Sequence, residues 1–301
     1  MINKYLIIII GVLSIVMVGS FKKTTYFHNK PKKETNLVLY DREKETKQTL
    51  ELENYIIGVV SAEMPASFNE EALKAQAVAA RTYALYMIKH SNKDYDLISD
   101  ISNQGYYDKE DMMLKWGKDY EYYYNKIKKA VNDTKGEVLT YNDEVIIAYY
   151  FAMSNGKTEN VQNVFREEKD YLKSVDSSWD KNVRDFEVRK CFSYEEFKNK
   201  LNIKDNYINI QDIKRNNTNR VEHIVINNKI YRGTDIRKLL NLRSTDFDII
   251  LKDNIYIYTR GYGHGVGLSQ WGANEMAKMG HNYKEILYYY YQNTKIKNIN
   301  V

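Results

Sequence analysis

The most apolar stretch of the chain lies at its N-terminus, where Tyr5 to Gly19 contains no charged residue. Counted to Phe21 it reaches about 17 residues, near the short end of a membrane-spanning helix. Because no small-residue cleavage site and no lipidation cysteine follow it, an uncleaved transmembrane anchor at residues 1–21 is favoured over a removed signal peptide. Lysines flank the stretch on both sides, so charge alone does not set its orientation.

Residues 22–47 are mainly polar and contain Pro31, with a short apolar break at Leu37 to Tyr40. This composition predicts a tether between the anchor and one folded region over residues 48–301.

Apolar residues at helical spacing predict a helix over Leu50 to Ala62, which Pro65 prevents from running on. Ser67 and Glu70 have the spacing of a capping box, and a second helix is expected from there to about Lys89. The two helices therefore flank a short elbow.

Downstream, helical and strand patterns are mixed and no internal repeat is present. Helices are expected at 115–135, 193–202, 234–241 and 269–279, and strands at 206–211, 221–231, 254–260 and, as a pair, 137–151. The order of these elements predicts an α+β fold, with mixed helices and sheets in two lobes around a substrate cleft.

Composition narrows the chemistry. The net charge of +5 is modest and both signs are interleaved, so no nucleic-acid-binding surface stands out. The single cysteine, Cys191, excludes an internal disulfide and a zinc site built from several thiolates. Tyrosine is unusually common, at 28 residues, which suits both sheet and core packing and grooves that hold sugars.

Glu63 stands at the elbow, at the end of the first predicted helix. The negative end of the helix dipole disfavours an ionised carboxylate there. Shielding by Met64, Pro65 and Phe68 would raise its pKa further, as a general acid requires. The competing interpretation is an ordinary solvated or capping glutamate.

Lys74 and Arg81 are seven residues apart, so they are expected on one face of the second helix, about 10 Å apart. Leu73, Ala77 and Ala80 begin the opposite, buried stripe. The polar face could line a groove, although basic residues on a helix usually just face water.

A second motif runs from Gly261 to Ala273 (GYGHGVGLSQWGA). Its alternating glycines predict a sharply turning or closely approached backbone, and their spacing fits neither a dinucleotide fingerprint nor a phosphate-binding loop. His264 and Gln270 can hydrogen-bond sugar groups, and Tyr262 and Trp271 offer stacking faces. A turn histidine and a core tryptophan are the competing interpretations.

Other reactions find less support. Ser269 and His264 lack an evident orienting acid for a serine hydrolase, and the remaining histidines show no metal-ligand spacing.

Two stretches together, VVSAEMPASFNEEALKAQAVAARTYAL at 59–85 and GYGHGVGLSQWGANEMAKMG at 261–280, resemble the stage II sporulation protein D family. Linking pieces at 148–161, 171–180 and 242–249 are also similar, and the resemblance covers about residues 46–295. It implies a sporulation-specific lytic transglycosylase anchored in the mother-cell membrane around the forespore, with its domain outside the cytoplasm. The implied substrate is peptidoglycan stripped of stem peptides by an amidase partner, stage II sporulation protein P, with protein M as membrane scaffold.

The resemblance makes Glu63 the catalytic residue and places Lys74, Gln76 and Arg81 at groove positions of the second helix. It brings in His264 and Gln270 from the second motif.

Ser154 to Lys157 are expected to form part of the wall of the same substrate groove. Some family members carry a Cys and His pattern after the second helix, but Asp96 to Gln104 contains neither residue type. No structural zinc and no cofactor are therefore expected, and that loop must be held by other contacts or be looser.

A glycoside hydrolase of the usual kind needs two carboxylates, whereas a lytic transglycosylase needs one. Glu63 is the carboxylate of the two motifs that reads as catalytic, which favours the one-acid scheme. Two alternatives stay open: a muramidase with Glu159 or Asp176 as the second carboxylate, and a catalytically silent scaffold that binds glycan and recruits an amidase.

Overall fold

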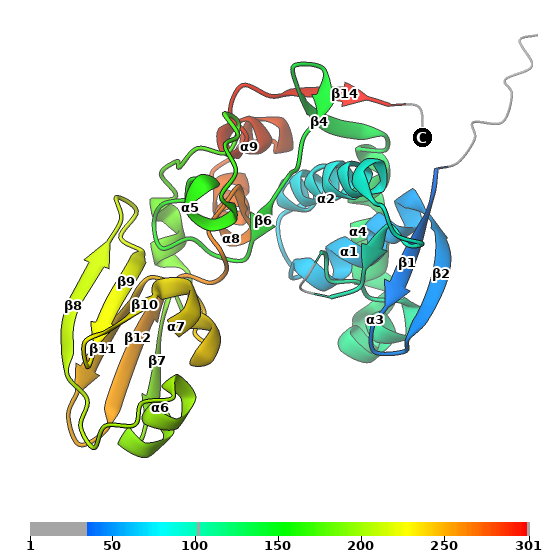
Figure 1. Cartoon of the computed structure of the whole chain (residues 1–301). Coiled ribbons are helices and arrows are strands. Elements are labelled where there is room, and N and C mark those ends of the chain that lie inside the picture. The colour runs from blue at the N-terminus through cyan, green and yellow to red at the C-terminus, as the bar shows by residue number, and fades with distance from the viewer. Residues whose placement is uncertain (1–34, 101–102, 300–301) are drawn as a thin grey trace, which may run out of the picture. The chain divides into compact units, whose positions relative to one another are not determined.

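The computed structural model describes residues 35–100 and 103–299 (Figure 1). The predicted anchor at 1–21 and the first half of the predicted tether, residues 22–34, lie outside the described residues. Among the residues described, no helix combines the length and apolar character needed to cross a bilayer.

The described residues form a mixed α and β structure, which confirms the predicted mixture of helices and sheets. The helices are α1 (Leu52–Glu63), α2 (Glu70–His90), α3 (Lys109–Trp116), α4 (Tyr120–Asp133), α5 (Gln162–Phe165), α6 (Tyr194–Leu201), α7 (Gly233–Leu239), α8 (Gln270–Lys278) and α9 (Tyr283–Tyr290), with short 3-10 turns η1 (Gly117–Asp119) and η2 (Ser178–Asn182).

The strands are short. They are β1 (Asn36–Asp41), β2 (Thr46–Glu51), β3 (Leu97–Ile98), β4 (Glu137–Tyr141), β5 (Glu144–Val145), β6 (Tyr150–Phe151), β7 (Glu187–Phe192), β8 (Ile210–Arg215), β9 (Val221–Ile226), β10 (Lys229–Arg232), β11 (Phe247–Leu251), β12 (Ile255–Arg260), β13 (Leu268–Ser269) and β14 (Lys295–Asn298).

These strands form small sheets in the described part of the chain, ordered β2-β1-β3, β10-β9-β8, β11-β12-β7, β13-β6 and β14-β4-β5. Most pairs are antiparallel, but β13 pairs in parallel with β6 and so joins the second motif to the segment at 150–151. This pairing fixes where α8 begins.

The tether prediction is wrong for residues 36–47. They form β1 and the start of β2, which pair antiparallel from Asn36 opposite Glu51 to Asp41 opposite Thr46. Leu37 and Leu39 alternate inward and are fully buried, so the short apolar break in the polar stretch is the buried face of a strand.

Three local predictions also need correction. Asn69, not Ser67, caps α2, and its side chain accepts a hydrogen bond from the Glu71 backbone N–H. The helix expected at 115–135 is two helices, because Gly117 adopts φ 51 between α3 and α4. The strand expected at 206–211 lies at β8, four residues later.

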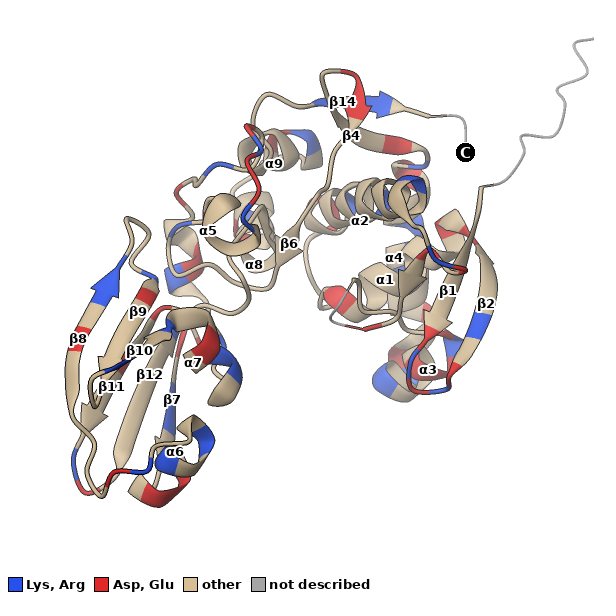
Figure 2. Ribbon diagram, viewed as in Figure 1, with Lys and Arg blue, Asp and Glu red and all other residues tan. Residues whose placement is uncertain are grey.

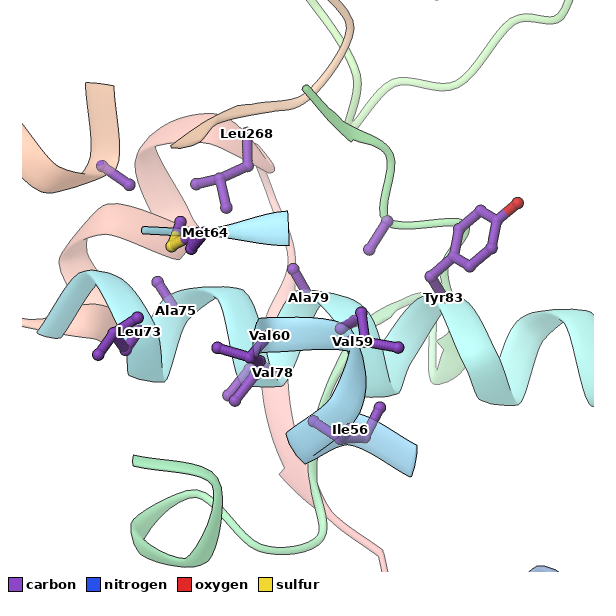
Figure 3. Packing of buried hydrophobic residues seen from close by; sticks show 14 of the residues in the cluster. Ile56, Val59, Val60, Met64, Leu73, Ala75, Val78, Ala79, Tyr83 and Leu268 are labelled. Atoms are coloured by element: carbon purple, nitrogen blue, oxygen red, sulfur yellow. The ribbon is translucent and has the colours of Figure 1, made fainter. Parts of the chain in front are cut away.

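The larger hydrophobic core is built around α1 and α2. Figure 3 shows Ile56, Val59 and Val60 of α1 packing against Val78 and Ala79 of α2. Small side chains such as Ala75, Ala77 and Ala80, all fully buried, let neighbouring elements approach α2 closely. Helix α2 is therefore buried along most of its length rather than on one stripe.

A second, smaller hydrophobic cluster is formed by β7, β9, β11, β12, α6 and α7, with Phe197, Ile224, Ile236, Phe247 and Ile257 fully buried. The predicted arrangement of two lobes around a cleft remains a prediction. In Figure 2, both basic and acidic residues are scattered over many of the elements, as the interleaved charges of the sequence indicated.

Candidate active site

Glu63 is the last residue of α1, as predicted. Its carboxylate is held by two donors: the Gly105 backbone N–H lies 2.7 Å from Oε1, and Gln270 Nε2 lies 3.3 Å from Oε2. Burial raises the pKa of the Glu63 carboxyl above its ordinary value, and these two hydrogen bonds act in the opposite direction. The site thus joins α1, the loop before α3, and α8.

The loop that carries Gly105 reaches Glu63 because Gly58 in the middle of α1 has no side chain. A Cβ at Gly58 would lie 2.3 Å from the Tyr106 ring, and the Tyr107 backbone N–H donates to the Gly58 carbonyl at 3.2 Å. A glycine inside a helical pattern signals such a close approach.

Gln104, the residue before Gly105, anchors this loop from inside. It is buried, accepts a hydrogen bond from Tyr55 Oη at 3.0 Å and donates to Tyr150 Oη at 2.8 Å. Burial raises the pKa of both tyrosines well above the ordinary value, and the nearby Glu63 charge adds to this rise. Two neutral hydroxyls therefore lie in the surroundings of Glu63.

The loop expected to be held by contacts other than zinc is held in this way, and also by Asp96. Its carboxylate accepts a hydrogen bond from the Val38 backbone N–H at 2.7 Å. Within residues 35–100 and 103–299, the His, Cys, Asp and Glu side chains form no cluster of three or more that could hold a metal ion.

Gln270 is the first residue of α8. Ser269 caps this helix, and its hydroxyl accepts a hydrogen bond from the Gly272 backbone N–H at 3.2 Å. Ser269 in turn donates to the buried carboxylate of Asp180 at 2.9 Å, which Ser177 also contacts at 2.8 Å. Burial raises the pKa of Asp180 to about 6. Asp180 thus positions the helix start that carries Gln270, a role that no local sequence pattern indicated.

The glycine run has the predicted backbone. Gly261, Gly263, Gly265 and Gly267 all have positive φ, between 74° and 113°. At Gly267 a Cβ would lie 2.0 Å from the Tyr149 carbonyl oxygen, so only glycine fits there.

Trp271 borders a surface hollow of about 380 Å³ between the elbow and α8. Its indole packs edge-on against Phe68, with ring centroids 4.7 Å apart, and Asn274 accepts a hydrogen bond from the Asn69 backbone N–H at 2.9 Å. Ser67 and Lys278 complete the rim. The structure therefore brings the elbow between α1 and α2 together with the second motif, at Glu63, Gln270 and Trp271.

The basic face expected on α2 is not formed, and the groove placement of Arg81 needs correction. Arg81 is fully buried, and its Nη2 and Nε donate to Glu53 at 2.6 and 2.8 Å. Lys74 is held within 3.3 Å of Glu70, Glu71 and Asp133. Arg81 is thus paired with α1, and Lys74 is paired with two glutamates of α2 itself and with Asp133 of α4.

Gln76 and Ser154 are also fully buried rather than at a wall. Both amide atoms of Gln76 lack a hydrogen-bond partner among the described residues. Ser154 Oγ donates to the Ser177 carbonyl at 3.2 Å and accepts from the Gly156 backbone N–H at 3.0 Å, so it shapes a turn.

Tyr262 and His264 contact other residues than Glu63. Tyr262 is 48% exposed, with the Arg243 guanidinium 4.6 Å from its ring centroid. His264 lies among the rings of Tyr149, Phe151 and Phe165, and its Nδ1 accepts from the Val266 backbone N–H at 3.1 Å. Burial and neighbouring arginines lower the pKa of His264 to about 3, so the ring is neutral.

Comparison with known proteins finds similarity to stage II sporulation proteins. Residues 40–141 match the family model described as Stage II sporulation protein. The chain is 42% identical over 269 residues to stage II sporulation protein D of Bacillus subtilis, covering 87% of this chain and 78% of that protein. It is 40% identical to the protein of the same name from Bacillus amyloliquefaciens, covering 83% and 75%.

A more distant similarity is to a Bacillus subtilis protein named amidase enhancer. The identity is 28% over 298 residues, which covers 79% of this chain but 40% of that protein.

Proposed function

Because the chain belongs to the stage II sporulation protein D family, we propose that it acts in sporulation as a peptidoglycan lytic transglycosylase that uses Glu63 as both acid and base. The observation that carries this proposal is the carboxylate of Glu63, which is partly buried, has a raised pKa and accepts hydrogen bonds from the Gly105 N–H and the Gln270 amide.

The reaction needs one proton donor that later accepts a proton. Protonated Glu63 gives its proton to the glycosidic oxygen between N-acetylmuramic acid and N-acetylglucosamine, and the bond from the muramic C1 to that oxygen breaks. The resulting carboxylate then removes the proton of the muramic C6 hydroxyl while the C6 oxygen bonds to C1, which closes a 1,6-anhydro ring. No water is consumed, and Glu63 ends protonated.

The surroundings of Glu63 suit both steps. Burial favours the neutral acid, while the Gly105 N–H and the Gln270 amide stabilise the carboxylate that forms after proton donation. Trp271 at the neighbouring hollow offers an apolar face on which a sugar ring can stack.

A two-carboxylate muramidase finds less support. Glu159 accepts hydrogen bonds from Asn163 at 2.8 Å and Asn216 at 2.6 Å. Asp176 accepts from Ser178 at 2.7 Å. Both carboxylates are thus already engaged by hydrogen bonds with their own neighbours.

The decisive experiment is mass spectrometry of products from purified glycan strands that lack stem peptides. Ends in the 1,6-anhydro form support the transglycosylase, and reducing ends from water addition support the muramidase. Absence of any cleavage by the parent protein would contradict both.

The similarity to a protein named amidase enhancer favours one second candidate, a glycan-binding protein that acts by stimulating a wall amidase. In that case the chain releases no glycan fragments itself, and Glu63→Ala leaves stimulation of the amidase unchanged. We propose stage II sporulation protein P as the amidase and protein M as the scaffold. The expected location is the mother-cell membrane around the forespore, with the domain facing the wall.

A further inference from the structure

A cavity of about 220 Å³ lies beside the glycine run, and His264 of that run forms part of its lining. Its lining includes four arginines (Arg166, Arg220, Arg232 and Arg237), the neutral His264 and two carboxylates, Glu159 and Glu222. Glu222 is paired with Lys214 at 2.9 Å. None of these groups has a role in the chemistry proposed for Glu63.

Arg220 is the most deeply buried of the four, at 5% exposure. Its Nη2 donates to the Lys157 carbonyl at 3.0 Å, but its buried Nη1 has no hydrogen-bond partner among the described residues. The nearest carboxylate oxygen, Glu159 Oε2, lies 3.8 Å from Nη1. A buried guanidinium normally has its donors satisfied, so this Nη1 is poised for an acceptor.

Glu159 does not fill that role because its oxygens are already used. Oε2 accepts from Thr218 at 2.5 Å and from Asn216 at 2.6 Å, and Oε1 accepts from Asn163 at 2.8 Å. The carboxylate is thus engaged by its own hydrogen-bond network, and it reaches Arg220 as an ion pair at 3.8 Å, too far for a hydrogen bond to Nη1.

The other arginines leave positive charge in excess. Arg232 is paired with Asp235 at 2.8 Å, whereas neither Arg166 nor Arg237 forms an ion pair with any described residue. Arg237 Nε has a long hydrogen bond, 3.4 Å, to the Leu242 carbonyl.

The glycine run is shaped around this cluster. A Cβ at Gly265 would lie 2.5 Å from Arg220 Nη2, so the guanidinium lies directly against the motif's backbone. The second motif therefore contributes to two sites. Gln270 donates a hydrogen bond to Glu63, and Gly265 leaves space for the Arg220 guanidinium at the cavity.

We propose that this cavity binds an oxyanion, and that its ligand is the carboxylate of an acidic sugar. Planar guanidinium groups match carboxylate and phosphate oxygens with paired hydrogen bonds. The volume is below that of pockets for drug-sized molecules, which suits one anionic group or a monosaccharide end. The choice of sugar rests on the proposed function, since the muramic sugar of a glycan without stem peptides carries a free lactyl carboxylate. Free phosphate is the other source of the same chemistry.

The test is calorimetric titration of the full chain, in detergent, with N-acetylmuramic acid, N-acetylglucosamine and inorganic phosphate. We expect N-acetylmuramic acid to bind at least tenfold more tightly than the neutral sugar. Arg237→Gln and Arg166→Gln should each weaken that binding by tenfold or more. Arg184→Gln is the matched control, because its side chain is 94% exposed. Thermal melting checks that each variant is folded.

Equal affinity for the two sugars, or equal losses in the Arg184 and Arg237 variants, overturns the proposal. Phosphate binding that depends on Arg237 without any binding of N-acetylmuramic acid supports the oxyanion site and overturns the acidic sugar. Because monosaccharide binding is measured without cleavage, this result is independent of whether Glu63 proves catalytic.

Discussion

Replacing Glu63 by glutamine tests the proposed chemistry with the smallest change in shape. The amide oxygen of the new side chain can still accept the Gly105 N–H, which lies 2.7 Å from Oε1. The nitrogen of the new side chain would take the place of Glu63 Oε2, which lies 3.3 Å from Gln270 Nε2, so two donors would face each other. Rotation of the Gln270 amide by half a turn places its oxygen there and restores a donor and an acceptor. We therefore expect the free energy of unfolding to change by no more than about 1 kcal/mol.

The loss of activity should be much larger. A general acid or base contributes about 10²–10⁴-fold to a rate, and Glu63 is proposed to serve in both steps. Glu63→Gln should thus lower the rate of release of anhydro-ended fragments at least ~100-fold, by that same estimate.

The assay is time-resolved mass spectrometry of fragments from denuded glycan, with urea unfolding of the same preparations. Glu195→Gln, an exposed glutamate on α6, is the control and should keep the parent rate. A folded Glu63→Gln protein that cleaves within a few-fold of the parent would refute the assignment.

Three further outcomes are expected. Gln270→Leu removes a donor that lowers the pKa of Glu63, so the basic limb of the pH–rate profile for cleavage should move to higher pH; an unchanged or lower limb contradicts the proposed role of this amide. Arg81→Met leaves Glu53 buried without its partner and should cost about 3–5 kcal/mol in urea unfolding, whereas a loss below about 1 kcal/mol would contradict a buried ion pair. The pKa of Asp180, raised to about 6, predicts a stability contribution that is complete below its unfolded pKa and is lost as pH rises through 6; Asp180→Asn should therefore flatten the pH dependence of melting between pH 4 and 7.

Elements set by local pattern could be predicted from the sequence. α1 and α2 lie within two residues of the expected bounds, and β12 and α8 within one. Apolar spacing, a proline and a glycine run are local signals, and they were sufficient there.

Elements set by distant partners could not. Leu37 and Leu39 lie in a strand that pairs with β2 and with the two-residue strand β3, about sixty residues further along the chain, and they are buried in the core around α1 and α2. A two-residue strand has no periodicity to detect, so the stretch looked like a tether with a brief apolar break.

The charged residues of α2 show the same limit at the level of side chains. Arg81 looked like a solvent-facing or groove residue because its position on the helix says nothing of Glu53, 28 residues earlier. One sequence signal did point the other way: the many small residues around Arg81 indicated close packing, and a helix packed on most sides has to bury its arginine with a counterion.

The candidate site depends on contacts that span most of the chain. Glu63 could be named from its motif, but its two donors lie 42 and 207 residues away. Gly58 permits one of these contacts, and Asp180 fixes the helix start that makes the other. A glycine in a helix and an aspartate in a short 3-10 turn do not reveal by themselves which distant residue they help to position. Their importance follows from the carboxylate they serve, because a residue that must both give and take a proton needs its two oxygens held while its charge changes.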